Sequence, residues 1–161
     1  MKLFVCLLLS FGFLQVNGQA NFQDQFVSLI KDVEVGLVNS RGTFKRLASS
    51  DSIFYSAIIL EGTINNEILV AGNKFHYTAD VADSLDEKQG RKSADDLKSR
   101  ISVMLNTKYK ISQLKIESWN PAIYGWRFKH NGITVSITLY RSGSVKSHFM
   151  VLGIDNFDVT D

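Results

Sequence analysis

Apolar residues near the start of the chain recur every three or four positions, a period typical of an amphipathic helix. The apolar stripe comprises Phe22, Phe26, Leu29, Ile30, Val33 and Leu37. The opposite face carries Asp24, Gln25, Lys31, Asp32 and Glu34. Asn21 is a suitable N-cap, and the segment from Asn39 to Gly42 is suited to end the helix. We therefore predict a helix that packs on a core along one side.

A second helix is predicted in the middle of the chain. The charged residues 82–92 (ADSLDEKQGRK) have the composition of a loop. Ser93 and Asp96 then have the spacing of a capping box, which marks a helix N-terminus. The apolar stripe of this helix comprises Leu97, Ile101, Met104 and Leu105.

The first strand is predicted at residues 53–61 (IFYSAIILE), an apolar run that follows a stretch without a clear period. The dipeptide Gly72-Asn73 then separates two alternating segments, as in a hairpin with a two-residue turn. This register pairs Val70 with Phe75 and Ile68 with Tyr77. It places His76 and Asp80 on the face away from the core.

The second hairpin has the stronger turn signal, Asn131-Gly132. Its register pairs Phe128 with Val135 and Trp126 with Ile137, and these four residues form an apolar face. The reverse face carries Arg127, Lys129, Thr134, Ser136, Thr138 and Tyr140. One face therefore belongs to the core and the other faces water.

The remaining strands have weaker signals. Leu114 and Ile116 alternate with polar residues and predict a strand, and residues 145–154 predict a last strand whose register stays open. The predicted order is α-βββ-α-ββββ. This order indicates an α+β fold in which two helices pack on a largely antiparallel sheet of six to seven strands, formed by a single domain of residues 21–161.

Residues 1–20 have the pattern of a signal peptide. Lys2 precedes the apolar run LFVCLLLSFGFL, and small residues follow that permit cleavage after Gly18 or after Ala20. The run is too short to be a comfortable membrane anchor. We therefore predict a secreted or periplasmic protein without a stable anchor after cleavage.

Composition then limits the chemistry. The only cysteine, Cys6, lies in the predicted leader, so disulfides, thiol catalysis and thiolate metal sites are not expected in the mature chain. The net charge of +2 gives no reason to expect nucleic-acid binding. Residues 19–87 carry five Lys/Arg against ten Asp/Glu, whereas residues 88–161 carry twelve against six. We find no cofactor motif and expect no cofactor.

Two groups of residues are candidate sites. Arg127, Lys129, Tyr140 and Arg141 come from one hairpin and could bind an anionic group or an acidic segment of a partner. His76 and Asp80 share one strand face and could begin a metal site or an acid–base pair. A metal site would need a third ligand, and a cluster of His76 with His130 and His148 would require the hairpins to converge.

The sequence therefore favours a non-catalytic binding module that recognises a protein or peptide through the exposed sheet face or an edge strand. Chaperone-like, inhibitor-like and adaptor roles all fit this description. The alternative is a small extracytoplasmic hydrolase, which in its metal-assisted form would use His76, Asp80 and a further histidine. A hydrolytic site built from dispersed His, Asp and Ser residues would leave no motif.

Overall fold

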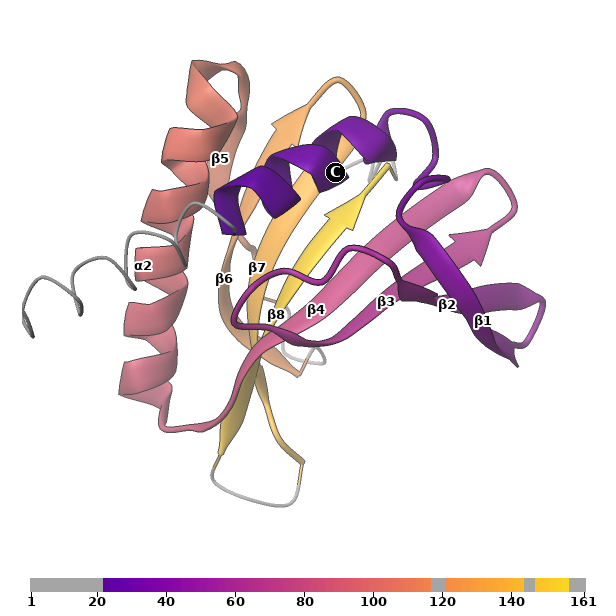
Figure 1. Ribbon diagram of the computed structural model, residues 1–161. Helices are drawn as coiled ribbons and strands as arrows, with labels where there is room; N and C mark the ends of the chain where they lie inside the picture. Colours follow the sequence, from indigo (N-terminus) through magenta and orange to yellow (C-terminus); the bar gives the residue numbers. More distant parts are fainter. Residues whose placement is uncertain (1–21, 117–120, 144–146, 157–161) are drawn as a thin grey trace, which may run out of the picture.

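The computed structural model describes residues 22–116, 121–143 and 147–156, and it shows an α+β fold (Figure 1). Two helices accompany an open, fully antiparallel sheet of eight strands in the order α-ββββ-α-ββββ. The helices span residues 22–33 and α2 (Glu87–Leu105), which is followed by a short 3-10 turn, η1 (Asn106–Lys108). The strands are β1 (Arg41–Ala48), β2 (Asp51–Ser56), β3 (Ile64–Ala71), β4 (Lys74–Leu85), β5 (Lys110–Gln113), β6 (Ala122–His130), β7 (Ile133–Arg141) and β8 (His148–Asp155).

The sheet consists of two meanders joined in its middle. Its strand order is β1-β2-β3-β4-β8-β7-β6-β5. Helix α2 takes the chain from β4, in the middle, to β5 at the far edge, and the chain then returns strand by strand to β8. Within the described sheet, the two meanders are thus joined through the pairing of β4 with β8.

Both helices pack their predicted apolar faces on the same side of the sheet (Figure 1). Phe26 and Leu29 of the first helix are completely buried, and so is Leu37, which lies in the turn after the helix. The prediction that Asp32 lies on a solvent-facing side was wrong, because this carboxylate is buried. It accepts hydrogen bonds from the backbone N–H groups of Asn39 and Ser40, at 3.2 and 2.6 Å, where the chain leaves the helix.

The two predicted hairpins are confirmed residue by residue. Val70 faces Phe75 and Ile68 faces Tyr77 across the Gly72-Asn73 turn. The second hairpin likewise shows every predicted pair, from His130 opposite Ile133 to Tyr124 opposite Leu139. Asn131 and Gly132 both have positive φ, at 47° and 76°, which this tight turn requires.

The predicted count of six to seven strands was wrong, because β1 was missing from the prediction. This strand lies at the edge of the sheet and contains two register shifts, between Arg41 and Phe44 and between Phe44 and Arg46. A bulge inserts a residue on one strand, so side chains lose the strict alternation by which a strand is recognised. Two irregularities within one short strand left no period to detect.

The predicted loop at residues 82–92 was also wrong. Strand β4 continues to Leu85, and α2 begins at Glu87, with Asp86 as its N-cap, instead of at Ser93. The Asp86 side chain accepts a hydrogen bond of 2.8 Å from the Gln89 N–H. The acidic residues that suggested a loop are those that stabilise a helix N-terminus.

Two strands are shifted from their predicted positions. The apolar run at 53–61 divides into β2 and a turn that buries Leu60, and β5 precedes Leu114 instead of including it. The register of β8 is now defined, with Arg141 opposite His148 and Leu139 opposite Met150. The predicted leader and Asn21 lie outside the described residues. Within the described part of the chain, no helix is long and apolar enough to cross a membrane.

Candidate functional site

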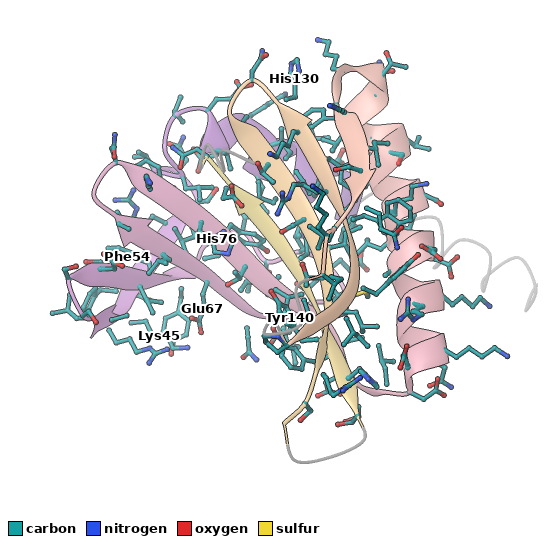
Figure 2. All side chains as sticks on the ribbon, turned by 180° about the vertical axis from the view of Figure 1, so that it is seen from behind. Lys45, Phe54, Glu67, His76, His130 and Tyr140 are labelled. Carbon is teal, nitrogen blue, oxygen red and sulfur yellow. The ribbon has the colours of Figure 1, made fainter. Side chains whose placement is uncertain are left out.

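The two described helices leave the opposite side of the sheet uncovered, and we call this side the helix-free face (Figure 2). Alternate strand residues project from it, since successive side chains point to opposite sides of a sheet. Its polar members, from β5 to β3, are Lys110, Ser112, Lys129, Arg127, Thr134, Ser136, Thr138, Tyr140, Asp155, His76, Thr78, Asp80 and Glu67, and Gly153, Phe149, Val151 and Leu69 lie among them. Most of these residues are polar, as predicted for the strands of both hairpins.

Three cations gather on the helix-free face where β5 meets β6, and we call Lys110, Arg127 and Lys129 the basic cluster. Lys110 lies directly opposite Lys129, and Ser112 lies directly opposite Arg127. Directly opposed residues have Cβ atoms about 5 Å apart, and like charges in such a pair repel. Arg127 and Lys129 are two positions apart on one strand, which corresponds to about 6.8 Å.

The surroundings of the basic cluster are small and polar. Thr134 faces Lys129 and Ser136 faces Arg127 from β7. Thr134 is only 4% exposed, so neighbouring side chains cover it. Lys110 and Ser112 are exposed, whereas Arg127 and Lys129 are half-buried, and neither of those two lacks a partner. The arrangement presents ammonium, guanidinium and hydroxyl donors, which suit a carboxylate or another oxyanion.

The structure separates the four residues of the predicted anion site. Arg127 and Lys129 stay together, but Tyr140 lies near the other end of β7, where it stacks on Phe149 with 5.2 Å between ring centroids. Arg141 does not belong to the group, because it follows Tyr140 in an unbroken register and points to the helix side.

The charge of Arg141 instead acts on Glu87, at the start of α2. The pKa of Glu87 is lowered mainly by its hydrogen bond with Arg91, and the charges of His148 and Arg141 add to this effect.

The residues of the predicted metal alternative are also apart. His76 and Asp80 share the helix-free face, but four residues of strand separate their Cα atoms by about 13 Å, too far for one ion to bind both. The His76 Nδ1 atom lies 3.6 Å from an Asp155 carboxylate oxygen, whereas Asp80 accepts a hydrogen bond from Asn65. Each side chain therefore has a different neighbour.

The three histidines do not converge. His76 is on the helix-free face, while His130 lies at the tip of the second hairpin, with its ring centroid 5.1 Å from that of Tyr109 (Figure 2). His148 is buried at the opposite end of the sheet, where its Nδ1 atom lies 3.2 Å from the Leu85 carbonyl oxygen. Among residues 22–116, 121–143 and 147–156, no three His, Cys, Asp or Glu side chains are grouped so as to hold a metal ion.

His76 has a second polar neighbour, which the sequence did not indicate. Gly153 of β8 is paired with Ser136 of β7 and with Thr78 of β4, and His76 is the neighbouring residue of β4 on the helix-free face. A Cβ atom built at Gly153 would lie 2.7 Å from the Ser136 hydroxyl oxygen and 3.1 Å from the His76 Cε1 atom. The missing side chain thus lets a serine and a histidine approach each other across the middle strand, with Asp155 on the other side of the imidazole.

Lys110 is the member of the basic cluster that sequence reasoning missed. It precedes the segment predicted as a strand, and nothing in its own neighbourhood fixes which residue of β6 it faces. The position of Arg127 and Lys129 followed from the Asn131-Gly132 turn, but β5 is joined to β6 by a longer connection. Only the structure therefore places the third cation beside the other two.

The two edges of the sheet are both protected against pairing with another strand. Edge strand β1 carries two register shifts and the cations Arg41, Lys45 and Arg46. Edge strand β5 has only four residues and begins with Lys110. Bulges, positive charge and short length are devices that discourage strand addition.

Comparison with known proteins gave no relative from which to transfer a function. No protein-family model matches the chain, and neither a curated protein nor a solved structure matches it.

Proposed function

We propose that this protein is a secreted or periplasmic, non-catalytic module that binds an acidic segment of a protein partner at the basic cluster. The observation that supports this most directly is the register that sets Lys110 opposite Lys129, with Arg127 on the same face. Three cationic side chains on two adjacent strands form a local positive charge, which suits an anionic group of a partner.

The helix-free face supports this proposal better than the edges do. The irregular β1 and the short β5 oppose strand addition, the edge-strand mode of binding that the sequence also allows. The face, in contrast, offers side-chain donors on adjacent strands, exposed on β5 and half-buried on β6. We therefore place recognition on side chains and not on edge backbone groups.

A short acidic segment also suits this face better than a nucleic acid. Asp155 lies on β8, two strands from Lys129, and Asp80 and Glu67 lie further along the same face. Glu67 is paired with Lys45 and Asp155 is buried beside His76, but these carboxylates would still weaken the attraction of a long polyanion that crossed the sheet. A partner that contacts β5 and β6 alone would avoid them.

The non-catalytic part of the proposal is supported by the geometry around His76. A histidine that activates a serine needs one ring nitrogen on the hydroxyl and the other hydrogen-bonded to the carboxylate. Here the His76 Nδ1 atom is 3.6 Å from the Asp155 oxygen, which is longer than a hydrogen bond. The carbon Cε1 lies nearer to the Gly153 position than Nε2 does, at 3.1 against 3.8 Å.

A serine hydrolase that uses Ser136, His76 and Asp155 is therefore the second candidate function, favoured by their proximity alone. It predicts hydrolysis of p-nitrophenyl acetate that saturates with substrate and falls by at least about a hundredfold in S136A and in H76A. We expect no such activity in the unaltered protein. Saturable hydrolysis that both substitutions abolish would overturn the non-catalytic proposal.

The extracytoplasmic location is supported by the sequence of residues 1–20, which combines a cation, an apolar run and small residues in the order of a signal peptide.

The proposal predicts that an acidic peptide binds and that charge reversal at the cluster prevents it. The probe is a fluorescein-labelled octaglutamate peptide, titrated at low salt and followed by fluorescence anisotropy. We expect the double variant R127E/K129E to bind it at least about tenfold more weakly, because two charge-assisted contacts become repulsive. The substitution K129E places a carboxylate opposite Lys110, so the double variant has no new like-charge pair across β5 and β6 and is expected to fold.

The matched control is K88E/K92E, which changes the net charge equally on exposed positions of α2. Retained binding by the control, with loss in R127E/K129E, supports the basic cluster as the site. An equal loss of peptide binding in both variants would show that binding depends on net charge alone, and it would overturn the assignment to the basic cluster. Absence of binding by the unaltered protein would overturn the proposal itself.

A further inference from the structure

The spacing of the basic cluster defines the acidic segment more closely. We infer that the segment is an extended strand with carboxylates on two alternate residues, an acid-x-acid pattern. This inference rests on the proposed function and specifies its partner.

The distance along β6 sets the spacing of the two acids. Arg127 and Lys129 are successive residues on the helix-free face, so their Cα atoms are about 6.8 Å apart. An extended peptide places alternate side chains on one side with this same repeat. Adjacent acidic residues of an extended peptide point to opposite sides, so only one of them can face the sheet.

The pairing across β5 and β6 makes two distinct positions for a carboxylate. One carboxylate would lie between the ammonium groups of Lys110 and Lys129. The other would lie beside the Arg127 guanidinium, which can bind both carboxylate oxygens, with the Ser112 hydroxyl opposite. Each position thus supplies at least two donors to one anionic group.

The surroundings of the basic cluster limit the pattern to two acids. The next residue of β6 on this face is Gly125, and a Cβ atom built there would lie 2.6 Å from a Leu114 methyl carbon. The Leu114 side chain therefore occupies the space above Gly125, and that position favours an apolar residue. In the other direction β6 ends at His130 and the turn begins. A third alternate carboxylate would find no cation from the described strands.

The experiment compares peptides of equal charge and composition that differ only in spacing. Each contains two glutamates in a threonine background, either adjacent, alternate or three positions apart, and each is titrated into the full protein by calorimetry. We expect the alternate peptide to bind about tenfold more tightly than the other two, the equivalent of one further charge-assisted hydrogen bond. In R127Q and in K129Q the three peptides should bind alike, whereas K88Q should keep the preference.

The outcomes separate this inference from the proposed function. Equal binding of the three spacings would overturn the acid-x-acid pattern and leave the acidic-segment proposal standing. Failure of all three together with octaglutamate would overturn both. A heparin fragment that binds more tightly than the alternate peptide and competes with it would identify an extended sulfated polyanion as the ligand and overturn the inference. Far-UV circular dichroism melts of each variant verify that it is folded.

Discussion

Asp32 shows what one residue contributes to this fold. Its carboxylate is buried at the end of the first helix, and it accepts hydrogen bonds from the N–H groups of Asn39 and Ser40 and from the Asn39 side chain. Burial raises the pKa of Asp32, but these hydrogen bonds outweigh burial and hold the pKa below its usual value. The ionised carboxylate thus fastens the helix to the start of β1.

We predict that Asp32→Asn lowers the free energy of unfolding by about 1 to 3 kcal/mol at neutral pH, because an amide N–H would face the Ser40 N–H. In the unaltered protein the contribution is present above the unfolded-state pKa of about 3.9 and is lost as the pH falls through the lower folded-state pKa. Urea denaturation between neutral pH and about pH 3 measures both effects. Asp24→Asn, at an exposed position of the same helix, is the control, and an equal loss in it would contradict the assignment.

At the scale of elements, the turn residues made the two hairpins predictable. The strands β1 and β5 have no such turn signal, and the prediction missed or displaced them. Asn131-Gly132 fixed the pairs between β6 and β7 from His130 to Tyr124, including the outward side of Arg127 and Lys129. No comparable signal exists for β1, where bulges remove the alternation, or for β5, whose register with β6 is set by tertiary packing. The sequence therefore predicted two members of the basic cluster and could not supply Lys110.

Besides its apolar packing on the core, helix α2 is joined to β6 by the hydrogen bonds of one carboxylate. Asp95 accepts hydrogen bonds from the Tyr124 hydroxyl and the Trp126 indole N–H, at 2.7 and 2.8 Å. Arg91 and Lys98 lie over the same two rings, each with its charged group 4.7 Å from the ring centroid. Burial, followed by the Asp95 hydrogen bond and charge, raises the pKa of Tyr124.

We predict that Asp95→Ala brings the pKa of Tyr124 closer to its ordinary value, because the acceptor and the negative charge are both removed. Absorbance titration of tyrosinate measures the change, and comparison with Tyr124→Phe identifies which tyrosine is responsible. The free energy of unfolding should fall by about 1 to 2 kcal/mol. An unchanged titration curve would show that Asp95 does not act on Tyr124.

At the scale of the whole molecule, the two meanders separate the charge. Residues 19–87, whose net charge is negative, include the whole β1–β4 meander. Residues 88–161, whose net charge is positive, include most of α2 and the β5–β8 meander. The asymmetry along the sequence therefore becomes an asymmetry across the sheet, and the basic cluster lies at the side away from β4. This distribution agrees with a partner that contacts one side only.

The extracytoplasmic proposal predicts a processed N-terminus. Expressed with residues 1–20 in a secreting host, the protein should be recovered from the medium or periplasm with Gln19 or Asn21 as its first residue. Intact-mass analysis of the purified product measures this. A cell-associated product that retains Met1 or Lys2 would contradict the prediction, and replacement of Leu8 by Arg, which interrupts the apolar run, should abolish processing.

The central position of β8 also determines when the fold can close. Synthesis releases a chain from its N-terminus, so β4 and β7 both have an unpaired edge until His148–Asp155 emerges. Neither meander can complete the shared core before that, because Met150, Leu152 and Ile154 belong to it. A nascent chain of this protein would thus stay open until β8 is free, and pairing of β8 with both meanders would close the sheet in one cooperative step.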